Sequence, residues 1–299
     1  MDSTIKTVFI GSVLLSKAAL EALLDLGVSI DLVCALSEEA SGTVSDYFPL
    51  HELAARRGIP CVTFRKIAEI QDRVAAAAPD FLFAIGISQI IPSGLLSAVR
   101  RRAIGFHPTA LPRYRGRAPI PWMILLGERT PSISLFQMDE GMDSGDILHQ
   151  EPYIIEDTDY ASDVYRKVCI ALAEGIKRSV PALYSGSAVF RKQEEEAATY
   201  LLVRRPEDGR IDWRQDGKRI HTLIRAAAPP YPGAFAYYKG EKIVITRAEL
   251  LKNDTFIGQD GQIAKVQGDV AYVLAGGGYL MALTEYGPRP RWAVGAKLD

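Results

Sequence analysis

Two residues near the middle of the chain could carry proton-transfer chemistry. His107 ends a short apolar run just before Pro108, and Asp143 lies 36 residues later in the loop MDEGMDSGD. Histidine takes up and releases a proton near neutral pH, and a neighbouring carboxylate stabilises the protonated ring. If the fold brings the two side chains together, we expect a general acid–base pair.

Each residue also has a simpler interpretation when it is taken alone. A single histidine is more often a core or surface residue than a catalytic one. Several acids in a glycine-rich loop are typical of a solvated turn. What distinguishes His107 is its surroundings, because two prolines and three arginines follow it within ten residues, in HPTALPRYRGR.

The elements around His107 alternate between strand and helix. Strands are expected at Thr7–Ile10, Ile30–Ala35, Cys61–Phe64, Phe81–Ile85 and Ala103–His107, with helices at Lys17–Leu26, His51–Arg57, Ile67–Ala77 and Ser93–Val99. This alternation predicts an α/β fold with a doubly wound, Rossmann-like, mostly parallel sheet. Such sheets bind ligands beyond the carboxyl ends of their strands, where His107 and the segment Gly86–Ile91 both fall.

The second half of the chain changes character. Two more strands, Ser132–Phe136 and Ile147–Ile155, are expected to be antiparallel, and a long helix follows at Tyr160–Ser185. The charged stretch RKQEEEAAT suits a linker at about 191–203. We therefore expect a catalytic domain at 1–190 and a smaller, β-rich, barrel-like domain at 204–299. Its short strands are expected at Ile243–Ile245, Ala264–Gln267, Ala271–Leu274 and Tyr279–Leu283.

Composition excludes several classes of function. The formal net charge is -1, so no general attraction to nucleic acid or membrane is implied. The first strand is followed by GSVLLS, which lacks the GxGxxG spacing of dinucleotide-binding proteins. The three cysteines are far apart, and no metal site is expected. The N-terminus has no secretion-signal pattern and no apolar run could cross a membrane, so we expect a cytoplasmic protein.

Three segments resemble the folate-dependent formyltransferases. GFHPTALPRYRG is similar to the signature HxSLLPxxRG of that family, and MDEGMDSGDIL is similar to its aspartate-bearing loop DxGDI. PEDGRIDW and the later IRAAAPPYPGA resemble the C-terminal domain of the methionyl-tRNA and nucleotide-sugar branches. The resemblance thus covers nearly the whole chain.

The resemblance implies a reaction centre made of His107 and Asp143 and a 10-formyltetrahydrofolate co-substrate. The histidine would take the proton that an amine loses when it attacks the formyl carbonyl, and an acid would return a proton to the leaving folate nitrogen. Donors aimed at the tetrahedral oxyanion would lower the barrier further. The positions that match the family's folate-binding loops are Gln89, Ile90, Ile91, Thr109, Ala110, Leu111, Pro112, Arg117, Asp139, Glu140, Gly141 and Met142.

One position departs from the family pattern. Most members carry Asn two residues before the histidine, where it helps to hold the oxyanion, and this chain has Gly105. Three explanations are open. A backbone N–H or a neighbouring polar group, Gln89 or Thr109, replaces the Asn; protonated His107 carries more of the charge; or the chain has lost transferase activity.

The acceptor amine is predicted to be small. In the tRNA branch the loop after the second strand is long and basic, but here Ser37–Asp46 carries three acids and no Lys or Arg. Phosphate contacts need basic side chains, so tRNA is disfavoured. A nucleotide-linked amino sugar, as in polysaccharide biosynthesis, needs only one or two arginines and an aromatic face. The candidates for that role are Arg113, Tyr114, Arg115 and Arg225, although Arg113 and Arg115 could instead pin the loop through carboxylates.

Three alternatives stay open at this point. The first is methionyl-tRNA formylation, the second a hydrolase that releases formate, and the third a non-catalytic protein that binds folate or a sugar nucleotide. The sugar, its nucleotide, the position of the amine and the oligomeric state do not follow from the sequence. The C-terminal β-domain is the candidate surface for a homodimer.

Overall fold

The computed structural model describes residues 5–299, apart from the side chain of Thr43, and separates them into two compact units. The first unit comprises residues up to Pro119, Arg129–Ile154 and Tyr165–Leu202; the second comprises Ile120–Glu128, Ile155–Val164 and Val203–Asp299. The expectation of a cytoplasmic protein rested in part on the N-terminal sequence. Residues 1–4 of that sequence lie outside the described part.

The first unit is built on a seven-stranded sheet with the order β3-β2-β1-β4-β5-β7-β8. The first five strands in this order are parallel. At one edge β7 pairs antiparallel with both β5 and β8. The strands are β1 (Thr7–Gly11), β2 (Leu32–Leu36), β3 (Cys61–Phe64), β4 (Phe81–Ile85), β5 (Arg102–His107), β7 (Ser132–Gln137) and β8 (Ile147–Pro152). The predicted doubly wound, mostly parallel sheet is confirmed.

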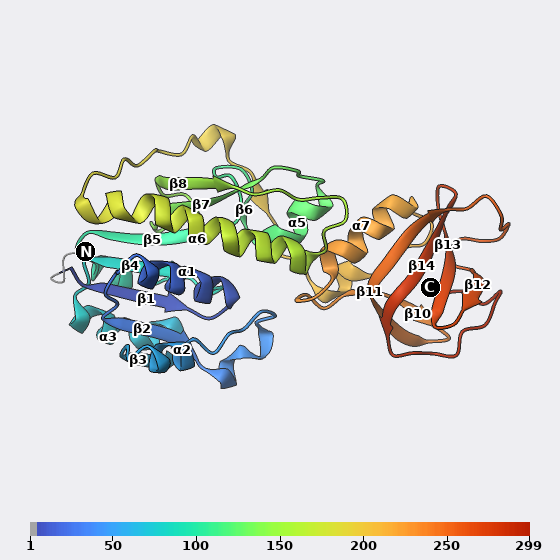
Figure 1. Cartoon of the computed structure of the whole chain (residues 1–299), viewed down its shortest axis with the longest axis horizontal. Coiled ribbons are helices and arrows are strands. Elements are labelled where there is room, and N and C mark those ends of the chain that lie inside the picture. The colour runs from blue at the N-terminus through green and yellow to red at the C-terminus, as the bar shows by residue number, and fades with distance from the viewer. Residues whose placement is uncertain (1–4) are drawn as a thin grey trace. The chain divides into compact units, whose positions relative to one another are not determined.

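Helices cover both faces of this sheet because its central strands are apolar on both sides. On one face Val8, Ile10 and Leu82 pack in a core cluster with the segment from Ile67 to Val74. Helix α6 runs along the opposite face (Figure 1). Near its end the ring of Tyr184 stacks on Phe81. The helices of this unit are α1 (Leu14–Asp25), α2 (Leu50–Arg56), α3 (Gln71–Ala77), α4 (Ser93–Ser97) and most of α6 (Ala161–Ser185), whereas α5 (Pro119–Leu125) belongs mostly to the second unit.

Helix α1 begins three residues earlier than the apolar pattern predicts because of Ser16. Its hydroxyl accepts the N–H groups of Ser12 and Val13 and donates to the carbonyl of Ile85. A Cβ at Gly11 would lie 2.4 Å from Ser16 Cβ. Gly11, the last residue of β1, therefore allows close packing of helix against strand. The expected helix Ile67–Ala77 is likewise divided, into a 3-10 turn at Ile67–Ile70 followed by α3.

The charged segment after α6 belongs to the first unit as far as Leu202, although most of its side chains are exposed. A 3-10 turn (Glu195–Ala197) is followed by the short strand β9 (Tyr200–Leu201), which pairs in parallel with β6 (Arg115–Gly116). Gln193 is buried. A strand of only two residues has no periodicity, so the sequence does not indicate it.

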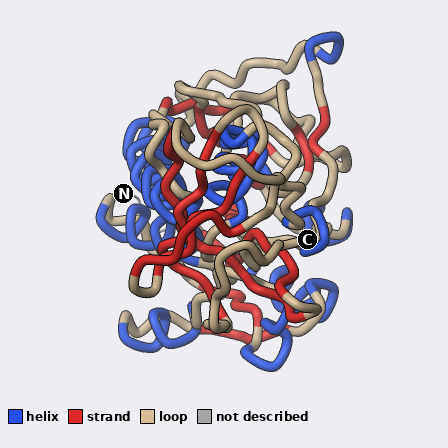
Figure 2. The backbone as a smooth tube through the Cα atoms, turned by 90° about the vertical axis from the view of Figure 1, so that its right-hand side faces the viewer, coloured by secondary structure: helices blue, strands red, loops and turns tan. Residues whose placement is uncertain are grey.

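The second unit contains a five-stranded antiparallel sheet with the order β10-β11-β14-β13-β12, drawn in red in Figure 2. The chain end joins the two edge strands, since Asp299 exchanges backbone hydrogen bonds with Tyr237 and Gly295 donates to Ile263. The barrel-like prediction is thereby confirmed. The strands are β10 (Ala234–Tyr238), β11 (Glu241–Lys252), β12 (Ile263–Gln267), β13 (Val270–Ala275) and β14 (Tyr279–Gly287).

A helix and a strand of the second unit were among the elements not expected. Helix α7 (Gly217–Ala227) begins at Asp216, whose side chain accepts the N–H of Lys218 as a helix N-cap. It packs against β11 and contributes Ile220 and Ile224 to the core of the unit. Strand β10 is the other. Within residues 5–299, none of the helices is both long and apolar enough to traverse a lipid bilayer.

Candidate active site

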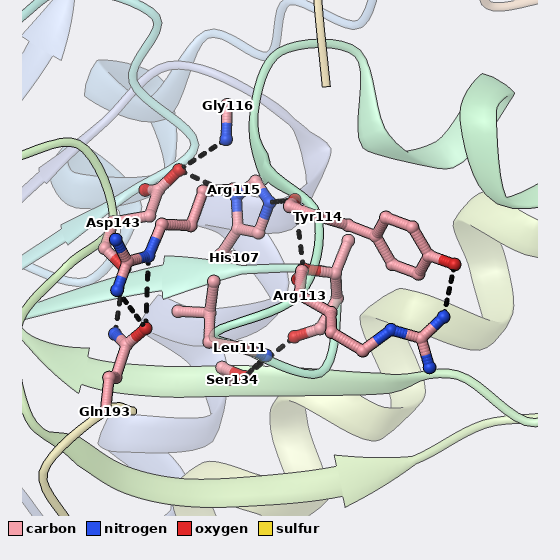
Figure 3. Close-up of polar contacts among 10 residues, drawn as sticks. His107, Leu111, Arg113, Tyr114, Arg115, Gly116, Ser134, Asp143 and Gln193 are labelled. Carbon is pink, nitrogen blue, oxygen red and sulfur yellow. Dashed lines mark hydrogen bonds and ion pairs between the residues drawn. The ribbon is translucent and has the colours of Figure 1, made fainter. Parts of the chain in front are cut away.

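His107 lies at the carboxyl end of β5, where it is buried, with 5% of its surface exposed. Its Nε2 atom is 2.7 Å from the carbonyl oxygen of Tyr114, and its Nδ1 atom is 3.5 Å from Asp143 Oδ2 (Figure 3). A carbonyl oxygen only accepts hydrogen bonds, so Nε2 carries a proton. The nitrogen left to gain and lose a proton is therefore Nδ1, on the side of the carboxylate.

The Tyr114 carbonyl is held in place by the loop that follows β5. The hydroxyl of Thr109 lies 3.0 Å from the carbonyl oxygen of Arg113 and 3.2 Å from that of Tyr114. Tyr114 has a φ of 65°, a left-handed conformation that is uncommon for a residue with a side chain. Such strain persists only where surrounding contacts impose it, and it turns this carbonyl toward the imidazole.

Ser134 supports the start of the same loop from the neighbouring strand β7. It stands opposite His107 in the sheet and is fully buried. Its hydroxyl donates to the carbonyl of Thr109 and accepts the N–H of Leu111 and an amide hydrogen of Gln150. Gln150 also donates to the Leu111 carbonyl. The backbone beside the imidazole is thus satisfied by side chains rather than by sheet bonding.

Asp143 is positioned by a hydrogen bond to its carboxylate and by its backbone conformation. Its Oδ2 accepts the N–H of Gly116 at 2.9 Å, and its φ is 53°. The loop before it is folded by Asp139, whose Oδ1 accepts the Gly141 N–H and the Ser144 hydroxyl. The carboxylate therefore faces Nδ1 with one hydrogen bond already made. This geometry can stabilise an imidazolium that forms when Nδ1 takes a proton.

The loops expected to bind folate present a mixture of committed and exposed groups. The amide of Gln89 is committed, because it accepts the N–H of Ile67 and donates to the carbonyl of Arg65. By contrast Ile90 is 86% exposed and Met142 is 60% exposed. Apolar side chains at the surface of two loops beyond the strand ends could pack on a flat ring.

The remaining candidates for folate binding lie in three loops. Thr109 and Leu111 are buried, and their backbone groups are already hydrogen-bonded to Ser134 and Gln150. Arg117 is exposed, and its backbone N–H donates to Leu201. Ile91 packs partly against the core below β4. The others lie beside these in the loops after β5 and β7: Ala110, Pro112, Asp139, Glu140 and Gly141.

The four residues predicted to bind the acceptor occupy different environments. Arg115 is 1% exposed, and its guanidinium bonds to Gln193, Glu195 and Tyr200. A side-chain hydrogen bond from Arg115 holds the pKa of the Glu195 carboxyl below its usual range. Arg115 therefore pins the loop through a carboxylate, which is the alternative to acceptor binding that the sequence left open.

Arg225 is also buried and belongs to the second unit, where its Nη1 donates to the carbonyl of Asp159. Arg113 differs because it is exposed, and its guanidinium lies 4.7 Å from the centre of the Tyr114 ring. The two side chains point away from His107 (Figure 3).

Gly105 is enclosed by apolar side chains. A Cβ added there would lie 2.9 Å from Phe136 Cζ and 3.0 Å from Met138 Cγ. The space into which an Asn would extend is therefore filled. Gln89 and Thr109, the two polar replacements considered from the sequence, both use their side chains in loop contacts.

Sequence reasoning missed the residues that hold the pair in place. Ser134, Gln150 and Gln193 are uncharged, lie outside the recognised motifs, and each bonds to at least one backbone atom of a distant segment. No local pattern distinguishes such residues, since their roles depend on contacts between distant segments. Among residues 5–299, no group of three or more His, Cys, Asp or Glu side chains could hold a metal ion.

Comparison with known proteins decides the family. Residues 37–179 match the formyl transferase family model, and residues 204–288 match that of the formyl transferase C-terminal domain. The chain belongs to the formyl transferase family. It is thus a folate-dependent one-carbon transferase.

Relatives of this formyltransferase act on different acceptors. A methionyl-tRNA formyltransferase from Geotalea uraniireducens is 29% identical over 246 residues, which cover 81% of this chain and 78% of that protein. The N-formyltransferase from Helicobacter canadensis, solved with folinic acid and dTDP-3-aminofucose, has a TM-score of 0.68 at 18% identity and covers 94% of this chain and 99% of its own.

A HypX variant from Aquifex aeolicus has a similar fold, with a TM-score of 0.70 at 16% identity. The match covers 93% of the formyltransferase chain and 43% of HypX, so this chain spans less than half of that protein. At such low identity these likenesses show the fold alone. The acceptor has to be argued from the residues of the formyltransferase itself.

Proposed function

We propose that this formyltransferase moves a formyl group from 10-formyltetrahydrofolate to the amine of a nucleotide-linked amino sugar. The observation that carries the proposal is the segment 37–46. It contains a 3-10 turn (Glu38–Thr43) followed by a loop, with Glu38, Glu39 and Asp46 and no cation. A polyanion such as tRNA would be repelled here, whereas a small acceptor need not touch the segment.

The exposed side chain of Arg113 and the half-buried ring of Tyr114 support a nucleotide. A guanidinium forms paired hydrogen bonds with phosphate oxygens, and an aromatic face can stack on a pyrimidine ring. Arg113 already stacks on the Tyr114 ring, so both groups are held at the surface of the loop that also provides the carbonyl partner of His107. The nucleotide would thus be bound by the loop that directly follows His107 in the chain.

The proposed chemistry follows from the proton on Nε2 of His107. The acceptor nitrogen attacks the formyl carbon, and Nδ1 takes the proton that this nitrogen loses. Asp143 stabilises the resulting imidazolium. The bond from the formyl carbon to the folate nitrogen then breaks, and Nδ1 returns the proton to that nitrogen, so that no net proton is consumed.

The oxyanion is proposed to depend on the imidazolium. Because Phe136 and Met138 fill the space beside Gly105, no side chain from that position can reach the oxyanion. The protonated ring forms in the same step as the oxyanion and supplies a charge-assisted donor from Nδ1. Backbone N–H groups of the loop after β5 would supply the rest.

The test is a panel of acceptors assayed with 10-formyltetrahydrofolate: dTDP-linked and UDP-linked amino sugars, methionyl-tRNA, and water alone. Mass spectrometry identifies the formylated product. We expect transfer to an amino sugar by the wild type and loss of transfer in His107→Asn, with folate still bound. Formate release without any acceptor would indicate a hydrolase, and folate binding without turnover on the whole panel would indicate a binding protein. Either result contradicts the proposal.

Methionyl-tRNA is the second candidate, favoured by the 29% identical relative and by cation–aromatic pairs in the second unit. Lys242 lies 3.9 Å from the centre of the Phe235 ring, and Arg210 lies 5.5 Å from that of Tyr237. Cations beside aromatic rings suit nucleic-acid binding. Formylation of methionyl-tRNA, with an affinity that falls steeply as salt rises, would establish this candidate and overturn the first.

A further inference from the structure

We infer that Gln193 is a positioning residue that sets the His107–Asp143 pair, and that it acts from the segment leading out of the first unit. We call residues 193–201 the strap. The inference rests on the proposed catalytic role of His107 and Asp143 and adds to it a residue from a segment expected to be a linker.

The side-chain amide of Gln193 is buried and makes four hydrogen bonds. Its Nε2 donates to the carbonyl oxygens of Asp143 at 2.8 Å and Gly145 at 2.7 Å. Its Oε1 accepts from Nε and Nη2 of Arg115 at 3.2 and 3.0 Å (Figure 3). A primary amide offers two donors and two acceptor sites, so every one is used. Such a side chain has a single orientation.

These bonds connect the two loops that enclose His107. On one side Gln193 holds the backbone on both sides of Ser144, next to the catalytic carboxylate. On the other side it holds Arg115, which is adjacent to Tyr114, the carbonyl partner of Nε2. The two neighbours of the imidazole are therefore positioned against each other through one amide group.

The strap makes a second connection further along. The hydroxyl of Thr199 accepts the N–H of Tyr114 at 2.8 Å, and its carbonyl accepts the N–H of Arg115. Tyr114 and Asp143 both have positive φ angles, 65° and 53°, which neither side chain favours. Backbone strain of this kind requires outside contacts to maintain it. The strap supplies such contacts to both residues.

The donors of Gln193 can be separated from its acceptors by mutation. Gln193→Glu keeps the oxygen that accepts from the Arg115 guanidinium but replaces the NH2 group that donates to the Asp143 and Gly145 carbonyls with a repulsive oxygen. Gln193→Met removes all four bonds at nearly constant volume. Ala197→Glu is the matched control, because it adds the same charge to an exposed position of the strap.

The first readout is kinetic and uses the full chain with the acceptor identified by the panel above. We expect kcat to fall about 10- to 100-fold in both Gln193 variants, because small displacements of catalytic groups cost that much. The KM for the acceptor and all constants of Ala197→Glu should stay close to the wild type. Wild-type kcat in Gln193→Glu would overturn the inference.

The second readout does not need an acceptor. Hydrogen exchange measured by mass spectrometry should accelerate in residues 113–118 and 139–146 of both Gln193 variants, while the sheet β10–β14 stays as protected as in the wild type. A residue with only a structural role would raise exchange throughout the first unit, and that result would overturn the inference. If no acceptor is formylated, the proposed function fails, but the exchange pattern still decides the role of Gln193.

Discussion

The Nε2 atom of His107 lies 2.7 Å from the backbone carbonyl of Tyr114, seven residues further along the chain. This single contact assigns the proton on the imidazole. A backbone carbonyl therefore selects the tautomer. The carboxylate of Asp143, on the other side of the ring, is left to stabilise charge.

The first prediction concerns the charge on Asp143. Asp143→Asn keeps an oxygen that can accept the Gly116 N–H, so the loop should retain its conformation. It removes the negative charge beside Nδ1, and kcat should fall about 10²- to 10⁴-fold. Rapid-quench kinetics measure this loss, and fluorescence titration should show unchanged folate binding. A kcat within twofold of the wild type would mean that the carboxylate has no role in catalysis.

The second prediction concerns the space around Gly105. Gly105→Ala places a Cβ within 3.0 Å of Phe136 and Met138, so the free energy of unfolding should fall by about 1–3 kcal/mol. Gly105→Asn should be worse, although it restores the residue type common in the family. Urea denaturation measures both. Adding Phe136→Leu, which shortens the obstructing ring, should recover part of the loss, and a double variant no more stable than Gly105→Asn would refute this explanation.

The sequence predicted the fold well because apolar strands and spaced helices determine it. Phe81–Ile85 and Cys61–Phe64 are bounded as expected because each is a short apolar run between turn residues. Helix α7 was not predicted because polar residues separate its few apolar ones, in GKRIHTLIRAA. Strand β11 is longer than predicted. Charged residues at its outward positions interrupt the apolar run, so only its centre was recognised.

The candidate site could be predicted in part. His107 and Asp143 were expected to meet because each belongs to a recognisable motif, and the structure brings them together. Their supports were not predictable. Gln193 and Ser134 act on backbone atoms of distant loops, and such contacts leave no spacing or periodicity in the sequence. Arg115 was assigned to the acceptor because an arginine in a motif gives no sign of being buried.

The third prediction concerns pH and Asp46, whose carboxylate accepts the hydroxyl of Tyr165 beneath the acidic loop. Burial raises the pKa of Asp46 above its ordinary value of 3.8, and the Tyr165 hydrogen bond opposes that shift only in part. A carboxyl whose pKa is raised by folding stabilises the folded state most at low pH. That stabilisation is lost as the pH rises through the folded-state pKa.

Asp46→Asn should therefore gain stability relative to the wild type as the pH is raised from below 3.8 towards neutrality. Urea denaturation across this range measures the difference in free energy of unfolding. Tyr165→Phe, which removes the donor to the ionised carboxylate, should have the opposite effect and lose most stability at neutral pH. A difference between Asp46→Asn and the wild type that does not change with pH would contradict the assignment.

The last prediction separates two arginines that the sequence could not distinguish. Arg115 is buried against Gln193 and Glu195, so Arg115→Met leaves the Gln193 oxygen without its donors. The free energy of unfolding should fall by about 1–3 kcal/mol, because a buried acceptor without a partner costs that much. Arg113 is exposed on the loop beside Tyr114, so Arg113→Met should leave stability unchanged. It should raise the KM for a nucleotide-linked acceptor about tenfold, which corresponds to losing one charged contact of about 1.4 kcal/mol. Inhibition by the free nucleoside diphosphate should weaken by the same factor, since both ligands would present the same phosphates to Arg113. If Arg113→Met leaves both constants unchanged, the nucleotide does not bind at this loop.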